Sequence, residues 1–431
     1  MLRPYKIIPS IHRPYANRSL VINDVRILGL MKITRQLIAF LIVLAGPLLL
    51  LSSTQTSEKA AKKGQYLAFV GTYTTKTSSK GIYGFRFDTA TGQLSAIGVA
   101  AETPDPSWVV VHPSGKYVYA ANEVGKASTV SAFAVDAKSG KLTLLNQMPA
   151  LGEDPCYLSF DKTGKFLFVA NYSSGTVAVF PILEDGRLGE HTALMKDQGA
   201  TGPNKERQEA PHAHWIETTT GNHFVYVADL GLDRVLIYNF DATNGSLKPG
   251  KRPGSMVVGV RAALDSFSAT LNAGAGPRHV AFDSRGDFMY VLGELNSMVT
   301  VFTYDALESY HQIQSLSTLP ADFAGRNDAA EIALHPSGKF LYTSNRGDDT
   351  IAIFSVDPAK GTLTFVDRVP TGGKEPRHFA IDPSGNYLLA ENQLSNNIVV
   401  FRINPATGGL TPTGQVAEVP SPVDLTFVAA E

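Results

Sequence analysis

Arginine, histidine and glutamate stand at the two ends of one apolar stretch of the sequence. Arg278 and His279 precede an alternating apolar run, and Glu294 follows the next such run. An arginine guanidinium can hold carboxylate or phosphate oxygens through two parallel hydrogen bonds. A glutamate or histidine beside it could take a proton from water. These residue types would suit hydrolysis of an anionic substrate, provided that the fold brings the two ends together.

The apolar runs that carry these residues belong to an internal repeat. Each copy holds four short runs in which apolar and polar residues alternate, separated by Gly, Asp, Asn, Ser or Pro turns. Alternation with a period of two predicts β-strands. A four-stranded unit that recurs about every 50 residues is typical of a β-propeller blade. The copies begin at Pro106, Pro155, Pro211, Pro277, Ala329 and Pro376.

The two ends of the repeat region supply one more blade. The runs 67–74, 80–88 and 92–100 match the second, third and fourth strands, and the run 421–430 matches a first strand. We therefore expect an all-β, seven-bladed β-propeller over residues 66–431, with four antiparallel strands per blade. Strands from both termini would close the ring and leave no exposed sheet edge. The segments 195–210 and 251–275 interrupt the repeat, and the strand assignment in the second stays open.

The repeat also serves as an internal control, because positions shared by all copies indicate scaffold and polar positions peculiar to one copy indicate a site. In an antiparallel pair, the start of the first strand and the end of the second lie at one edge of the sheet. First strands line the channel of a propeller, so these positions should ring one channel mouth, where small ligands usually bind. The polar side chains expected there are Arg278, Arg346, Arg377, His212, His214, His279 and Glu294, together with His378, Glu331, Glu391 and Tyr73.

Asparagine or aspartate ends the second strand of most copies. Such side chains satisfy turn backbone, so this position indicates scaffold; Asn171 occupies it and is also kept as a candidate ligand contact. The copy from Pro277 departs from the rule, with Gly293 at this position and Glu294 directly after it. The alternative interpretation is that each Arg or His at a strand start only makes a structural hydrogen bond between blades.

Composition excludes several classes of function. The chain has 38 basic and 39 acidic residues, which argues against a nucleic-acid partner. A single cysteine, Cys156, excludes intramolecular disulfides and cysteine-rich metal sites. His212 and His214 have the spacing of metal ligands, but no acidic or cysteine partner is placed beside them. Haem, phosphate-loop and nucleophile-elbow motifs are missing, so we expect neither metal nor cofactor.

The N-terminal region has the pattern of an export signal. Lys32 and Arg35 precede the apolar run Leu37–Leu51, and small and polar residues follow it. This predicts a signal peptide over 31–56, a linker over 57–65 and a periplasmic or secreted protein. Residues 1–30 would then be a non-native or disordered extension before a start at Met31. The alternative is an uncleaved membrane anchor. Without such an anchor, the protein would contact the membrane only through its signal peptide.

The sequence resembles the lactonase family of seven-bladed propellers over residues 66–429. That family includes propeller-type 6-phosphogluconolactonases and the fungal cis,cis-muconate lactonizing enzyme. The stretches that carry the resemblance are "FVGTYT", "GAGPRHVAFD", "ELNSMVTVF" and "HPSGKFLYTSNR". The resemblance implies a catalytic group of one His, two Arg and one Glu at the channel mouth. By motif these are Arg278, Glu294, Arg346 and, in the loosest match, His212.

The resemblance implies metal-independent hydrolysis of a sugar lactone, of the 6-phosphogluconolactone type. Arg278 and Arg346 would hold the anionic substrate and stabilise the oxyanion, and Glu294 or His212 would activate water. The expected substrate contacts are Arg377, His279, His214, Asn171 and Tyr73. An export signal conflicts with a cytosolic phosphorylated substrate, so the natural lactone stays open, and we expect a monomer.

Two other functions are alternatives to lactone hydrolysis. Many propellers are interaction platforms, so a non-catalytic exported propeller that binds a small anionic ligand or a protein partner is the main alternative. A quinone- or metal-dependent oxidoreductase is disfavoured because no clear ligands for such a group stand in the sequence.

Overall fold

The computed structural model describes residues 64–250, 268–304 and 310–430. The chain divides into two units, Met1–Glu58 and Lys59–Glu431, and every described residue belongs to the second. The predicted extension, the predicted signal peptide and the linker up to residue 63 lie outside the described residues. Among the described residues no helix is long and apolar enough to span a membrane.

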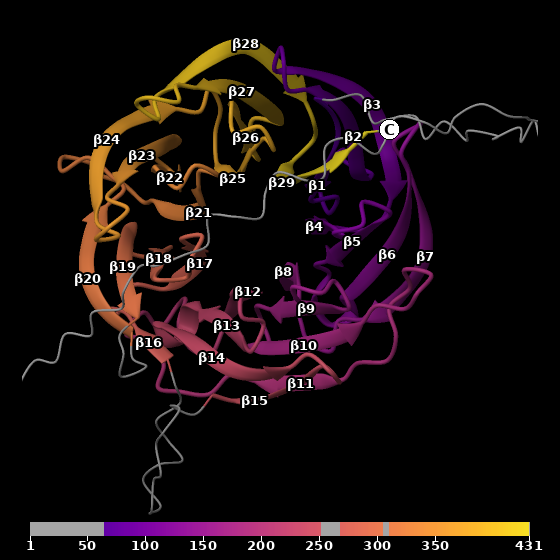
Figure 1. Ribbon diagram of the computed structural model, residues 1–431, viewed down its shortest axis with the longest axis horizontal. Helices are drawn as coiled ribbons and strands as arrows, with labels where there is room; N and C mark the ends of the chain where they lie inside the picture. The colour runs from indigo at the N-terminus through magenta and orange to yellow at the C-terminus, as the bar shows by residue number, and fades with distance from the viewer. Residues whose placement is uncertain (1–63, 251–267, 305–309, 431) are drawn as a thin grey trace, which may run out of the picture. The chain divides into compact units, whose positions relative to one another are not determined.

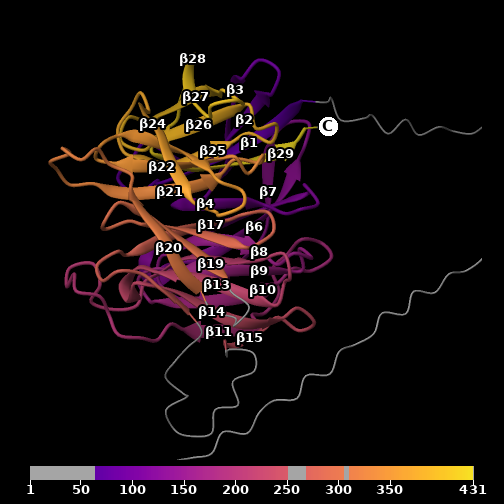
Figure 2. The same cartoon turned by 60° about the vertical axis from the view of Figure 1, so that its left-hand side comes forward.

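The strands form seven antiparallel sheets. Figure 1 shows them following one another around a closed ring, and Figure 2 shows the same ring in a turned view. Blade 2 consists of β4 (Pro106–Val111), β5 (Tyr117–Asn122), β6 (Thr129–Asp136) and β7 (Lys141–Pro149). Blade 3 consists of β8 (Pro155–Phe160), β9 (Phe166–Asn171), β10 (Thr176–Pro181) and β11 (Ala193–Lys196). Two short 3-10 helices, η1 (Gly125–Ala127) and η2 (Leu230–Leu232), lie in the turns after β5 and after β13 (Phe224–Asp229).

Blades 5 to 7 keep the same strand order. Blade 5 consists of β17 (Pro277–Phe282), β18 (Phe288–Gly293), β19 (Met298–Tyr304) and β20 (Tyr310–Ser317). Blade 6 consists of β21 (Asp328–Leu334), β22 (Phe340–Arg346), β23 (Thr350–Val356) and β24 (Leu363–Pro370). Blade 7 consists of β25 (Pro376–Ile381), β26 (Tyr387–Asn392), β27 (Asn397–Ile403) and β28 (Leu410–Glu418).

Blade 4 is the irregular member of the ring. It consists of β12 (Ala213–Thr218), β13 (Phe224–Asp229) and β14 (Arg234–Asp241), with the outer position divided between β15 (Ser246–Pro249) and β16 (Ser268–Thr270). Both short strands pair with β14, at its two ends. The strand assignment that the sequence left open is thus settled for 268–270, while 251–267 lie outside the described residues.

Blade 1 closes the ring with strands from both ends of the propeller. Its inner strand is β29 (Pro422–Ala429), which pairs with β1 (Gln65–Thr72); β2 (Gly81–Asp88) and β3 (Gln93–Glu102) follow outward. The expected seven blades, four-stranded sheets and two-terminus closure are therefore confirmed. The first strand begins at Gln65, one residue before the predicted boundary.

Apolar side chains pack between neighbouring blades and hold the ring together. Phe168 of blade 3 meets Phe240 of blade 4 with ring centroids 5.0 Å apart, and Phe87 of blade 1 meets Tyr387 of blade 7 at 5.8 Å. Alternation along each strand sends one set of apolar residues to each face, so every blade is buried on both sides. Burial of each large side chain contributes about 2 kcal/mol.

Buried asparagines at the ends of the second strands fasten each blade to the one before it. Asn345 donates a side-chain N–H to the Thr318 carbonyl (3.1 Å), where blade 5 ends. Asn392 does the same to Thr371 (3.3 Å) and Asn171 to Ala150 (3.1 Å). The scaffold interpretation of this position is confirmed. Asn171 is fully buried in these contacts, which leaves it no surface for a ligand.

Blade 5 lacks this asparagine because the backbone leaves no room for it. A Cβ at Gly293 would lie 2.8 Å from the Ala275 carbonyl oxygen and 2.3 Å from Asn296 Oδ1. The close approach of residue 275 brings the connection before β17 against the end of β18. Glycine at this position therefore supports the geometry of the neighbouring Glu294.

Every inner strand carries an irregularity in register near its start. In blade 5, Pro277 pairs with Gly293 and His279 with Leu292, so Arg278 is an extra residue. Such a bulge re-aims side chains locally. The extra residues of the other blades include Ser107, Cys156, His214 and Arg377.

The bulges correct the predicted alignment of blade 4. Its register skips from Ala213 to Trp215, so Ala213 holds the position that Pro277 holds in blade 5. The repeat therefore begins two residues later than the predicted start at Pro211. His214 is the counterpart of Arg278, and His212 lies before the strand, at the position of Gly276.

We expect replacement of Asn345 by alanine to destabilise the propeller by about 1–3 kcal/mol, because the buried Thr318 hydroxyl loses an acceptor and the Thr318 carbonyl loses one of its two donors. Urea unfolding followed by fluorescence would measure this change. The control is Asn386→Ala, which removes an exposed amide in the turn before β26. Equal stabilities for the two variants would contradict the role given to Asn345.

Candidate active site

One hydrogen bond brings the two ends of each inner hairpin together at the channel mouth. The Glu294 N–H donates to the carbonyl of Gly276 (2.8 Å), and Glu123 and Tyr172 make the same bond to Asp105 and Asp154. Gly276 has a φ of +58°, a left-handed conformation that glycine adopts without cost. Because of this bond, residues far apart in sequence become neighbours, as expected from the sequence.

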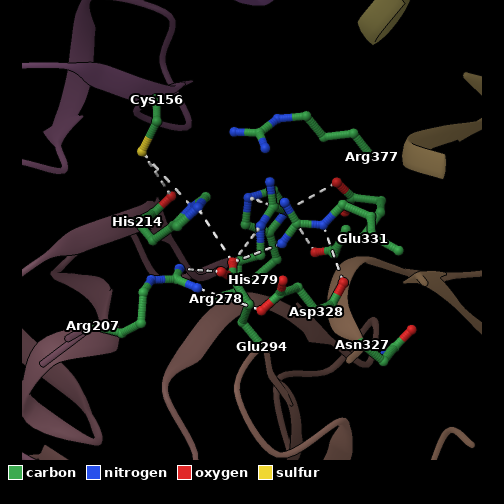
Figure 3. A network of polar contacts seen from close by, with 12 residues as sticks. Cys156, Arg207, His214, Arg278, His279, Glu294, Asn327, Asp328, Glu331 and Arg377 are labelled. Atoms are coloured by element: carbon green, nitrogen blue, oxygen red, sulfur yellow. Dashed lines mark hydrogen bonds and ion pairs between the residues drawn. The ribbon is translucent and has the colours of Figure 1, made fainter. Parts of the chain in front are cut away.

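Glu294 lies at the centre of the site, between guanidinium groups from three segments. Its carboxylate is 3.1 Å from Arg278 Nε and 3.0 Å from Arg346 Nη2, and it also accepts a hydrogen bond from Arg207 Nη2. Glu294 and Arg278 are each 3% exposed. Figure 3 shows Arg207 and Arg278 reaching the Glu294 carboxylate from different sides.

The electrostatics of this cluster fix its charge state. Burial alone would raise the pKa of Glu294, but Arg346, Arg278 and Arg207 outweigh it and hold that pKa well below its ordinary range. Burial and the like charges of Arg346 and Arg377 lower the pKa of Arg278 to about 10. Glu294 is therefore a carboxylate at neutral pH and a weak base, while Arg278 stays protonated.

The cations keep unused hydrogen-bonding capacity. Arg278 Nε and Arg346 Nη2 are buried and lack an aligned hydrogen bond, although both lie within ion-pair distance of Glu294. Their other donors are held in place: Arg278 Nη1 binds the Ala330 carbonyl, and Arg346 Nε binds the Asp328 carbonyl (3.0 Å). Two donors in fixed positions therefore point toward one region, and neither makes a well-aligned hydrogen bond there.

Arg207 is a member of the site that the sequence analysis missed. It comes from the connection between β11 and β12, where the neighbouring Gln208 donates to the Leu230 carbonyl (2.8 Å) and to Asp233 (2.7 Å). Arg207 Nη1 also contacts Asp328 Oδ1 at 3.4 Å. In the sequence, Arg207 stands in the segment 195–210, which interrupts the repeat. Because this segment has no counterpart in the other copies, an alignment of the repeats could not place it.

A chain of histidines and carboxylates lies next to the arginines. His279 Nδ1 is 2.9 Å from Glu331 Oε2, and Arg278 Nη1 lies 3.3 Å from the other ring nitrogen of His279. Burial and Arg278 hold the pKa of His279 well below its ordinary value, and the same causes act on His214. Both imidazoles are therefore neutral at pH 7. His214 Nε2 is 3.9 Å from Glu294.

His378 joins three buried carboxyl groups. Its Nδ1 is 2.9 Å from Glu391, and its Nε2 is 3.5 Å from Asp424 and 3.7 Å from Glu331. Burial raises the pKa of Glu331 and Glu391, and it raises the pKa of Asp424 to about 7 despite His378 and the N–H of Val109. This group was only partly predicted, since Asp424 was not named.

His212 and Tyr172 stand beside the arginine cluster. Their rings stack with centroids 4.5 Å apart, His212 Nδ1 lies 3.1 Å from the Tyr172 carbonyl, and its Nε2 lies 3.1 Å from the exposed carboxylate of Glu209. The predicted residues Tyr73 and Arg377 contact each other (3.0 Å). Asn171, in its scaffold position, is the predicted site residue that the structure keeps away from this region.

The described residues contain no group of three or more His, Cys, Asp or Glu side chains placed to hold a metal ion. Two cavities of about 550 Å³ each lie at the other ends of the strands, around the turn at His112. His112 bonds there to the Gly164 carbonyl (2.8 Å) of the next blade, as a structural residue would. The concentration of buried charge therefore identifies the channel mouth, not these cavities, as the candidate site.

Known proteins match the propeller over most of its length. The family described as "Lactonase, 7-bladed beta-propeller" matches residues 67–427. A 6-phosphogluconolactonase of Bacillus subtilis is 36% identical over 316 residues, which cover 73% of this chain and 84% of the relative. A 6-phosphogluconolactonase of Formosa agariphila is 33% identical over 72% of this chain and 85% of its own length. The solved structure of a Pseudomonas aeruginosa periplasmic gluconolactonase has a TM-score of 0.77 and 34% identity, over 85% of this chain and 100% of that one.

The raised pKa of Asp424 predicts a pH-dependent stability. The unfolded carboxyl titrates near 3.8 and the folded one near 7, so the folded state binds the extra proton between these values. Its stability is then highest below pH 4 and falls as the pH rises through 7. We expect wild type to lose a few kcal/mol relative to Asp424→Asn between pH 4.5 and 8.

Urea unfolding at several pH values would measure this difference. The control variant Asp367→Asn changes an exposed carboxylate on β24 and should run parallel to wild type. Parallel curves for Asp424→Asn and wild type would show that the Asp424 carboxyl is not held protonated by the fold.

Proposed function

The chain belongs to the lactonase family of seven-bladed β-propellers, and on this premise we propose that it hydrolyses sugar lactones of the gluconolactone type. The relatives named above act on 6-phosphogluconolactone or gluconolactone by their names. Metal-independent attack of water on the lactone carbonyl is the proposed reaction, at the channel mouth.

The observation that carries this proposal is the convergence of two buried guanidinium groups, those of Arg278 and Arg346, at the channel mouth. Both lie within ion-pair distance of Glu294, and a backbone carbonyl holds each of them in place. When water adds to a lactone carbonyl, the carbonyl oxygen becomes an oxyanion. Preorganised donors that bind it more strongly than the neutral carbonyl lower the barrier, typically by about 3 kcal/mol each.

Glu294 has an organising role in this mechanism. Three guanidinium groups would repel one another without a buried anion between them. Its low pKa makes it a poor acceptor for a proton from water. We therefore assign to Glu294 the positioning of Arg278 and Arg346, which revises the expectation that it could be the base.

We assign the role of general base to His212. In the tautomer that donates Nδ1–H to the Tyr172 carbonyl, Nε2 carries the lone pair. Stacking on Tyr172 holds the ring, and the partner of Nε2 is an exposed carboxylate that can move aside. Nε2 would take a proton from the attacking water; the C–O bond of the ring then breaks, and the ring oxygen takes that proton to give the hydroxy acid.

We further propose that the enzyme is exported and acts as a monomer. The basic, apolar and polar segments over 31–56 support a signal peptide, and one similar structure is that of a periplasmic gluconolactonase. An exported enzyme would meet sugar lactones that carry acidic groups other than phosphate as well.

Replacement of Glu294 by glutamine should reduce kcat/KM for gluconolactone at least about 100-fold, because the arginines lose their common anchor. His212→Asn should reduce kcat by a similar factor with little change in KM. A pH-stat assay corrected for spontaneous hydrolysis would measure both.

The control for these variants is Glu418→Gln, which changes an exposed carboxylate on β28 and should keep full activity. Circular dichroism would confirm that each variant is folded. Wild-type rates for folded Glu294→Gln would refute its role. If wild type hydrolysed neither gluconolactone nor its 6-phosphate, the proposed activity would be wrong and a non-catalytic binding role would be favoured.

A further inference from the structure

Arg377 differs from the other arginines of the channel mouth in its partners. Arg207, Arg278 and Arg346 all contact Glu294. Arg377 forms no ion pair with any carboxylate among the described residues; its single hydrogen bond runs from Nη2 to the Tyr73 hydroxyl (3.0 Å). In Figure 3 its guanidinium reaches toward the network with no contact to the residues drawn.

The Tyr73 ring orients Arg377 from one face. The guanidinium carbon lies 5.4 Å from the ring centroid, within the range of a cation–π contact. The Tyr73 hydroxyl donates to Glu123 Oε2 (2.8 Å). Arg377 is therefore linked to the Glu123 carboxylate only through this hydroxyl. Tyr73 therefore fixes the direction of Arg377 while leaving most of its five N–H donors unused.

Arg377 is partly buried, and Tyr73, Glu123 and Glu294 outweigh burial and raise its pKa, although no carboxylate contacts it directly. At the mouth, four guanidinium groups face the carboxylates of Glu294 and Asp328, with Glu123 bonded to Tyr73. Arg278 and Arg346 are fixed by Glu294 and by backbone carbonyls. Arg377 is thus the cation with free donors for a second negative group.

We propose that Arg377, oriented by Tyr73, binds an oxyanionic substituent of the substrate, phosphate or carboxylate, at a subsite separate from the oxyanion donors Arg278 and Arg346. This inference rests on the proposed lactone hydrolysis and assigns separate roles to the arginines within it. The first pair acts on the reacting carbonyl, and Arg377 selects acidic sugar lactones over neutral ones.

The alternative is that Arg377 only supports Tyr73 and the wall of the mouth. The chain offers a matched comparison, since Arg402 makes the same kind of contacts on the outside of blade 7. Arg402 lies 5.3 Å from the Tyr387 ring centroid and donates from Nη2 to the Tyr387 hydroxyl (3.2 Å). Arg402 is exposed and lies near the other end of the blade, so an arginine–tyrosine stack alone does not require a ligand.

The test compares three lactones: 6-phosphogluconolactone, glucaro-1,4-lactone, which carries a carboxylate, and neutral gluconolactone. Arg377→Gln should lower kcat/KM for an acidic lactone about 100-fold more than for gluconolactone, mainly through KM, as expected for one charged contact. Arg377→Lys should keep part of the preference. Whichever acidic lactone loses the larger factor identifies the phosphate or the carboxylate as the group bound.

Calorimetric titration with 6-phosphogluconate, glucarate and gluconate provides a second measurement that does not depend on turnover. We expect wild type to bind 6-phosphogluconate or glucarate, which carry a second acidic group, more tightly than gluconate, and Arg377→Gln to remove that difference. If wild type shows this preference but hydrolyses no lactone, the proposed reaction fails while the subsite stands.

Arg402→Gln is the control and should leave all rates and affinities unchanged. Equal losses on acidic and neutral lactones in Arg377→Gln would overturn the proposal in favour of a structural role. No preference of wild type for 6-phosphogluconate or glucarate over gluconate would overturn it as well. Should Arg377→Gln fail to fold, Arg377→Lys and Tyr73→Phe carry the same comparison.

Discussion

A buried carboxylate surrounded by guanidinium groups is the constraint on which the candidate site depends. Arg207, Arg278 and Arg346 come from three separate segments, and like charges at such distances would drive these segments apart. Glu294 removes that repulsion and orients the nitrogens it contacts. The free energy spent on desolvating the ions is offset only because each arginine also donates to a carbonyl or hydroxyl nearby. The polar mouth is therefore a single electrostatic unit rather than a set of independent residues.

The propeller supplies this unit with fixed positions through two local devices. A bulge at the start of each inner strand adds one residue, so that consecutive side chains such as Arg278 and His279 both take part in the polar network. A backbone hydrogen bond from the end of the second strand, as between Glu294 and Gly276, holds the hairpin ends together. Repetition of both devices around the ring means that a change of side chain in one blade alters the site without altering the scaffold.

The fold was predictable from sequence because its cause is periodic. Alternating strands and turn residues repeat, blade 1 is split between the two ends of the repeat region, and the structure confirms these features. Arg278, Glu294 and Arg346 could be placed together for the same reason. Arg207 could not, since it lies in a connection that has no counterpart in other blades. The position of His212 was shifted because a bulge is not visible in an alternating pattern, and the charge state of Glu294 depends on neighbours that only three dimensions reveal.

The closure of blade 1 has a consequence for how the protein is made. β29 is the last strand of the ring to be synthesised, and it carries Asp424, which contacts His378 and the N–H of Val109. Tyr73, beside Arg377, follows β1, whose only inner neighbour is β29. During synthesis, the inner edge of β1 therefore stays unpaired until β29 has emerged from the ribosome. The contacts of Asp424 with His378 and Val109, and the pairing of β29 with β1, can form only after β29 has been synthesised.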